Sequence, residues 1–125
     1  MPRNWASFPP HRLPVIALRV SDTIVRALAD TGASQSLIDP RLIKQIGIEA
    51  TDTGLIVGIG TNPLRVSFVT LDGVVIGRCS LQPFRAGVLD LSHLRIGIQL
   101  ILGINAFRGY RLQFDLAEGR LYLLF

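Results

Sequence analysis

An acidic residue placed directly after an apolar segment limits what this chain can fold into more than any other feature. Two short apolar runs, 13–20 and 24–29, are separated by Ser21-Asp22-Thr23, and Asp30 follows the second run. Runs of this length around a polar turn predict a β-hairpin whose strands lie mostly inside the protein. Asp30 would then stand at the end of a buried strand, where a carboxylate without partners is costly. A chemical role explains that placement better than a structural one.

The residues after Asp30 are all small: Thr31, Gly32, Ala33 and Ser34. Asp-Thr-Gly also occurs as an ordinary turn at the end of a strand. The tripeptide alone therefore leaves both a catalytic loop and a plain turn open.

The rest of the sequence predicts a mainly β domain with one or two short helices. Asp39-Pro40 is typical of a helix start and Gly47 of a helix end, so one helix is expected from Pro40 to Gln45 or Ile46. A long hairpin is expected over 54–71, with Gly58-Ile59-Gly60 in its tip. The turn that follows this hairpin is expected at Asp72-Gly73 or at Gly77-Arg78. The second position is slightly preferred, because it leaves a longer and more regular strand.

Further strands and turns are expected towards the end of the chain. These are a buried strand over 99–103, a helical turn or two over 105–110, an alternating strand carrying Leu112, Phe114 and Leu116, a turn at 117–119 and a last strand over 120–125.

The length of 125 residues suits one compact domain, and 49% apolar content allows a packed core. We expect this domain to span 13–125, preceded by an extended arm over 1–12 whose aromatic residues, Trp5 and Phe8, dock on another surface.

Composition excludes several partners. The net charge is +4, but twelve of the thirteen positive residues are arginines spread singly along the chain, so no nucleic-acid surface is expected. No apolar run is long enough to span a membrane, and the N-terminus lacks a secretory signal, which predicts a cytoplasmic protein. Cys79, His11 and His93 have no neighbours at metal-ligand spacing. We therefore expect no metal, no cofactor and no disulfide, with Cys79 acting as a small half-buried residue.

The Asp30-Thr31-Gly32-Ala33-Ser34 segment is followed, after the glycine-bearing hairpin, by Ile101-Leu102-Gly103 and a helical segment. This order resembles the retropepsin-like aspartic proteases of retroviruses and their bacterial and cellular relatives over roughly residues 13–125. The resemblance implies a closed β-barrel of the acid protease type with one flap hairpin per chain.

The resemblance also implies roles for individual residues. Asp30 would be the catalytic aspartate, Thr31 would brace the paired loops across a dimer axis, and Gly32 would admit the substrate backbone. Gly58, Ile59 and Gly60 would form the flap tip, and Ile101 would line a side-chain pocket. The strand 121–125, with the arm near Trp5, would interleave with the termini of a partner chain.

Two positions depart from the viral pattern. Viral members commonly carry an acidic residue where this chain has Ser34 and an arginine where it has Ile104, and those two pair with each other. Because the acidic residue and the arginine are both missing here, neither leaves an unpaired charge. Ser34 is more like the bacterial and cellular members, and the way this dimer is braced cannot be carried over from the viral ones.

Hydrolysis by this chemistry needs two carboxylates, one to take a proton from water and one to hydrogen-bond the peptide carbonyl. The chain has a single Asp-Thr-Gly and no second copy of it. The resemblance therefore implies a homodimer that cleaves peptide or protein substrates as an aspartic endopeptidase. The alternative is a catalytically silent module of the same fold that binds peptides or dimerises without cutting.

Overall fold

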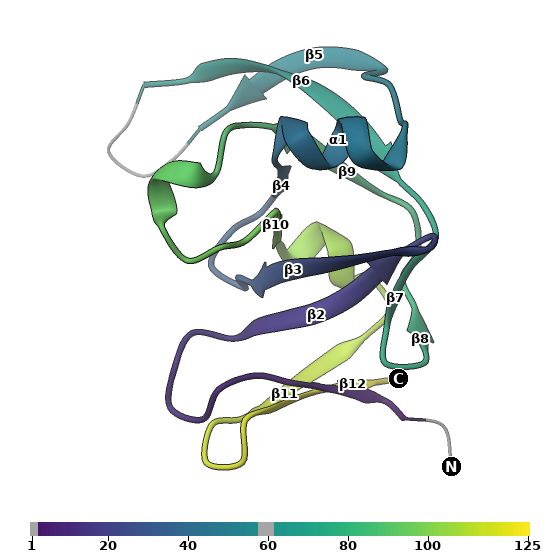
Figure 1. The fold of residues 1–125 in the computed structure, drawn as a ribbon, viewed down its shortest axis with the longest axis vertical. Coiled ribbons are helices and arrows are strands. Elements are labelled where there is room, and N and C mark those ends of the chain that lie inside the picture. Colours follow the sequence, from purple (N-terminus) through teal and green to yellow (C-terminus); the bar gives the residue numbers. More distant parts are fainter. Residues whose placement is uncertain (1–2, 58–61) are drawn as a thin grey trace.

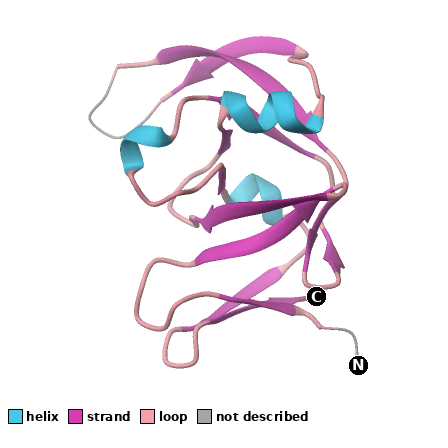
Figure 2. Cartoon of the chain, viewed as in Figure 1, coloured by secondary structure: helices cyan, strands magenta, loops and turns pink. Residues whose placement is uncertain are grey.

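A computed structural model describes residues 3–57 and 62–125 and shows a mainly β protein with one α-helix (Figures 1 and 2). The predicted tip residues Gly58, Ile59 and Gly60 lie outside the described residues. The strands are β1 (Trp5–Ser7), β2 (Val15–Val20), β3 (Thr23–Ala29), β4 (Ser36–Ile38), β5 (Asp52–Ile56), β6 (Leu64–Leu71), β7 (Val74–Ile76), β8 (Cys79–Ser80), β9 (Phe84–Val88), β10 (Leu100–Leu102), β11 (Arg111–Asp115) and β12 (Arg120–Leu124). The helices are α1 (Pro40–Ile46) and the 3₁₀ turns η1 (Ser92–Leu94) and η2 (Ile104–Phe107).

Nine strands form one sheet that curls into a half-barrel, in the order β5-β6-β9-β4-β10-β3-β2-β7-β8. The chain thus has the predicted mainly β architecture. A core of apolar side chains fills the inside of the curl. Its largest fully buried members are Phe68, Ile16, Ile38, Leu42, Leu71, Ile76, Leu100, Leu102, Leu121, Leu123, Val25 and Val69.

The predicted hairpin over 13–29 is present as β2 and β3, with Val20 opposite Thr23 across a two-residue turn. Its burial differs from the prediction, because inward and outward residues alternate along both strands. Arg19 and Arg26 lie on the outer face, and Ile24 is 64% exposed. The expectation that these strands lie mostly inside is wrong, since an antiparallel hairpin at the surface buries only one of its faces.

The predicted helix is present at Pro40–Ile46. The Asp39 carboxylate accepts the main-chain N–H of Arg41 at 2.9 Å, which caps the N-terminus. Gly47 ends the helix in the left-handed region at φ 74°, and its N–H donates to the Ile43 carbonyl. Leu42 is the fully buried residue of this helix, and Ile43 and Ile46 are partly buried against the same core.

The long hairpin is formed by β5 and β6, with Ile56 opposite Leu64. The following chain bends at both candidate turns. Gly77-Arg78 is the hairpin turn, joining β7 to β8, as favoured from the sequence. The longer strand expected to run through Asp72-Gly73 does not form, because β6 pairs with β9 whereas β7 pairs with β2.

The two ends of the chain form a separate sheet in the order β1-β12-β11 (Figure 1). Trp5 pairs with Tyr122, and Gln113 pairs with Tyr122 from the other side. The prediction that the last strand interleaves with a partner's termini is wrong for this strand, because both edges of β12 are used within the chain. Leu121 and Leu123 point into the chain's own core, at 0% and 2% exposure.

The alternating strand ends at Asp115, one residue earlier than predicted. Leu116 therefore lies in the turn and is 52% exposed, whereas Leu112 and Phe114 pack against the core.

Candidate active site

The loop that carries Asp30 begins where β3 meets β10. These strands are parallel, with Leu102 opposite Ala29, and the N–H of Asp30 donates to the Leu102 carbonyl at 2.9 Å. The sheet ladder thus extends to the acidic residue itself. Asp30 is half-buried, and its main chain is held by the core of the sheet.

The carboxylate of Asp30 is oriented by its own loop. Its Oδ1 accepts the N–H of Gly32 at 3.0 Å, and the N–H of Ala33 donates to the Asp30 carbonyl at 3.2 Å. A side chain at position 32 would place its Cβ 3.3 Å from the same Oδ1. Gly32 therefore keeps the space beside the carboxylate open, which is consistent with the role predicted for it.

A hydrogen-bond network around the buried hydroxyl of Ser36 holds the far side of this loop. Ser36 is 0% exposed, and its hydroxyl accepts the N–H of Gly103 at 3.0 Å and donates to Asn105 Oδ1 at 2.7 Å. Asn105 Nδ2 in turn donates to the Arg85 carbonyl at 2.7 Å. The start of β4, the segment that follows β10 and strand β9 are thereby tied together around one hydroxyl.

Gly103 is at the closest approach of these segments. A Cβ there would lie 2.5 Å from the Gln35 carbonyl oxygen and 2.8 Å from that of Ala33. Only a glycine lets the chain leaving β10 pass this close to the Asp30 loop. The resemblance pointed to Gly103 from the sequence, but this steric reason requires the fold.

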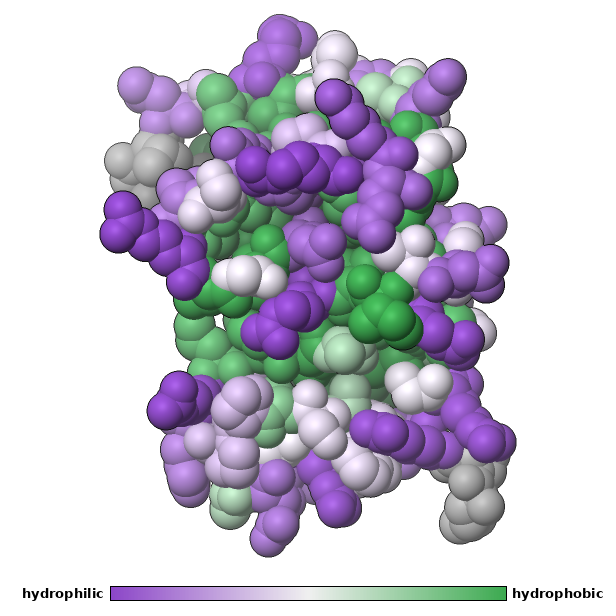
Figure 3. All heavy atoms as spheres, viewed as in Figure 1, coloured by the Kyte–Doolittle hydropathy of each residue, from purple (hydrophilic) through white to green (hydrophobic). Residues whose placement is uncertain are grey.

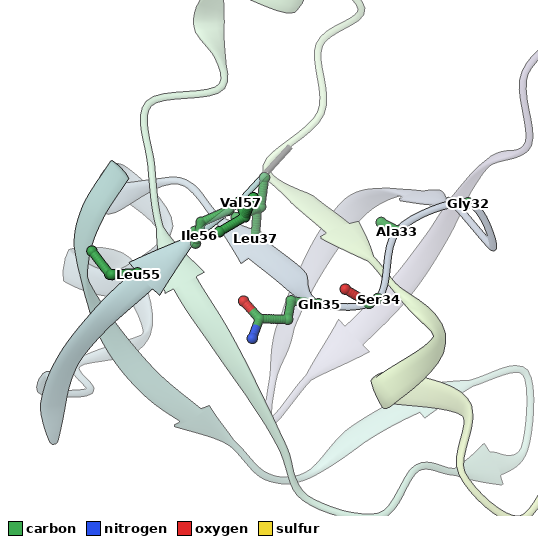
Figure 4. Close-up of a pocket in the computed structure, with 8 residues that line it drawn as sticks. All are labelled: Gly32, Ala33, Ser34, Gln35, Leu37, Leu55, Ile56 and Val57. Carbon is green, nitrogen blue, oxygen red and sulfur yellow. The ribbon is translucent and has the colours of Figure 1, made fainter. Parts of the chain in front are cut away.

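A cavity of about 560 Å³ lies between the Asp30 loop and strand β5 (Figure 4). Its lining residues are Gly32, Ala33, Ser34, Gln35, Leu37, Leu55, Ile56 and Val57. One wall is the loop main chain with the Ser34 and Gln35 side chains, and the other is the apolar end of β5. A slot of this kind, with polar main chain on one side and apolar side chains opposite, fits an extended peptide.

The predicted site residues divide into those that meet here and those that do not. Gly32, Ala33 and Ser34 line the cavity; Asp30 lies directly beside it, bonded to Gly32; and Thr31 is exposed. Ile101 is 8% exposed and belongs to a small apolar cluster with Leu91 and Ile98, outside the cavity lining. Its pocket role stays a prediction.

Sequence reasoning missed three residues of this site: Ser36, Asn105 and Gln35. Ser36 and Asn105 are far apart in the chain, and nothing in their local context shows that they bond. Gln35 follows directly on the motif, and its position in the loop was the one signal available for it.

A second missed feature is an ionic network that joins the start of α1 to the segment before η1. Arg41 bonds Asp39 at 2.6 Å and Asp90 at 2.9 Å, and the N–H of Leu91 donates to Asp39 at 3.0 Å. Burial raises the pKa of Asp39, but the hydrogen bonds from Arg41 and Leu91 outweigh it, so this pKa lies below its usual value. Hydrogen bonds from Ser92, with Arg41 adding, lower the pKa of Asp90 to about 2.

Within residues 3–57 and 62–125, no group of three or more His, Cys, Asp or Glu side chains is placed to hold a metal ion. In the same part of the chain, no helix has the length and apolarity that a membrane crossing requires. The cytoplasmic location stays a prediction from the sequence.

Comparison with known proteins decides the family. The model of the family described as aspartyl protease matches residues 16–106, which include the Asp30 loop, β10 and Gly103. The chain belongs to the aspartyl protease family. No curated protein matches the sequence.

Two solved structures share the fold of this aspartyl protease chain. A retropepsin-like aspartic protease from Rickettsia conorii superposes with a TM-score of 0.64 at 21% identity, covering 95% of this chain and 87% of its own. The retroviral protease-like domain of Ddi1 from Leishmania major gives 0.55 at 17% identity, covering 90% and 94%. At these identities the likeness shows the fold, and the chemistry has to be argued from the site.

Proposed function

We propose that this chain is an aspartic endopeptidase that works as a homodimer, with one Asp30 from each copy. The observation that carries the proposal is the placement of Asp30. Its main chain continues the buried sheet, its carboxylate is held by Gly32, and a cavity between the loop and β5 opens directly beside it. Membership of the aspartyl protease family supports the same function.

The second copy is required by the reaction. Two carboxylates held about 3 Å apart cannot both ionise, so the pair shares one proton. The ionised member takes a proton from a water molecule, whose oxygen attacks the peptide carbonyl, while the protonated member donates to the carbonyl oxygen. The tetrahedral intermediate then collapses with proton transfer to the amide nitrogen, which breaks the C–N bond. One Asp30 per chain supplies half of this pair.

The cavity indicates how a peptide is held. Leu55, Ile56 and Val57 offer an apolar wall, so we propose apolar side chains near the scissile bond. Gly32 lines the opposite wall and lets the substrate main chain approach the carboxylate. The flap tip and Ile101 remain further candidates for substrate contact.

The test is cleavage of a diverse peptide library between pH 4 and 7, read by mass spectrometry. The Asp30→Asn variant should fold and dimerise but lose at least about a thousandfold in cleavage rate, because the general base is gone. Asp72→Asn is the matched control, since Asp72 is an exposed aspartate whose carboxylate also accepts a main-chain N–H of its own turn. It should cleave like the wild type.

Unchanged cleavage by Asp30→Asn would exclude this mechanism. A wild-type chain that binds library peptides without cutting them would instead favour the silent binding module. The activity should be highest at acidic pH, because the pair must hold one proton.

A further inference from the structure

An apolar residue stands exposed on the loop system that carries Asp30. Ile104 begins η2, and its N–H donates to the Ala33 carbonyl at 2.8 Å. It is 53% exposed, whereas Ala106 and Phe107 of the same turn are buried at 1% and 5%. The turn therefore packs its later residues into the core and leaves its first side chain outside, next to the active-site loop.

A second exposed apolar residue flanks the other side of the same strand end. The Ala29 N–H donates to the Pro14 carbonyl at 3.1 Å, and the preceding residue, Leu13, is 57% exposed. Hydrophobic side chains also reach the surface along the edge of the molecule where β3 ends (Figure 3). Asp30 thus lies between two segments that each present a large apolar side chain to solvent.

The last strand has no free edge for a second copy. Strand β12 is paired with β1 on one side and β11 on the other. Its main-chain hydrogen bonds are therefore used within the chain, and it cannot also take up a strand from a partner. Among the described residues the outer edges of β1 and β11 have no strand partner, and a contact beside the Asp30 loop would add to any pairing there.

We propose that Ile104, together with Leu13, forms an apolar brace between two copies of this chain, holding the two Asp30 loops together. The inference rests on the proposed function, because a second Asp30 about 3 Å away brings the partner copy onto this loop. Side chains on the segments that are hydrogen-bonded to this loop and to the end of β3 can then contact the partner copy. Two-fold symmetry uses each brace residue twice in one interface. Ile104 is a positioning residue: it acts by setting the second carboxylate in place.

The experiment compares Ile104→Gln with the wild type by sedimentation velocity over a concentration series. Glutamine is of similar length and adds no charge beside Asp30. The dimer dissociation constant should rise tenfold or more, because two apolar contacts are lost per dimer. Ile104→Leu should dimerise like the wild type. Ile24→Gln is the matched control, since Ile24 is 64% exposed but lies at the opposite end of β3 from Asp30.

The concentration dependence of cleavage distinguishes weakened dimerisation from a local disturbance of the Asp30 loop within one copy. The Ile104→Gln variant should lose cleavage at low protein concentration and regain it as the concentration rises. Two copies joined by a flexible linker should restore its cleavage rate, because the linker raises the effective concentration of the partner. A tethered variant that stays inactive while the tethered wild type cleaves would refute the brace, because the defect would then lie within one copy.

The brace and the proposed function can fail separately. If the wild type dimerises and Ile104→Gln dissociates but neither cleaves peptides, the brace is supported and the protease proposal fails. If Ile104→Gln dimerises as tightly as the wild type, the brace is overturned whatever the activity. A wild type that stays monomeric at all concentrations overturns both.

Discussion

Replacing Gly103 by alanine should destabilise the fold at the point where it supports Asp30. The new Cβ would lie 2.5 Å and 2.8 Å from the carbonyl oxygens of Gln35 and Ala33, where ordinary contacts begin at 3.4 Å. Both obstacles are main-chain atoms, so no side chain can rotate away. The backbone of Gly103, at φ −80° and ψ 179°, is one that alanine adopts freely. The whole cost is therefore steric.

The magnitude follows from the size of the required shift. One of the two segments has to move by most of an ångström, which places the substitution at the upper end of overpacking costs, about 3 kcal/mol. For a domain of this size that corresponds to a fall in Tm of roughly 10 °C. The same displacement at the Asp30 loop should lower kcat/KM on the order of a hundredfold.

Thermal unfolding at one fixed protein concentration measures the effect, because dimerisation makes Tm depend on concentration. Gly47→Ala is the matched control. A Cβ at Gly47 would meet nothing within 4 Å, but its φ is 74°, so alanine there carries only a backbone cost of about 1 kcal/mol. A Gly103→Ala protein at least as stable as Gly47→Ala would refute the steric reasoning.

Two further outcomes are expected. The pKa values of Asp39 and Asp90 are lowered in the folded state, so the stability that these carboxylates contribute is complete above about pH 4. It is lost as the pH falls through the folded pKa values, about 2 for Asp90. Arg41→Met should therefore flatten the fall in urea midpoint between pH 5 and 2, whereas Lys44→Met on the same helix should not. Leu121→Ala should cost about 2–5 kcal/mol in unfolding free energy, because its side chain is fully buried in the chain's own core. An unchanged urea midpoint would contradict that placement.

Local signals in the sequence predicted several elements well. The cap at Asp39, the stop at Gly47, the β2–β3 turn and the buried strand β10 each depend on residues that are neighbours in the chain. The local signals missed that the β2–β3 hairpin has an exposed face, and the family resemblance placed the partners of β12 in a second chain. Both of those depend on what packs against the strand, which a short window of sequence does not contain.

The sequence by itself determined that a loop beginning with Asp30 follows an apolar strand, and that the chain contains a single Asp-Thr-Gly. Both are properties of the order of residues along the chain. Only the tertiary structure decided how that loop is supported. Ser36, Gly103 and Asn105 meet around one buried hydroxyl, and Ile104 stands exposed beside Ala33, because β10 inserts between β3 and β4. Such contacts join residues distant in sequence, so their geometry exists only once the sheet has formed.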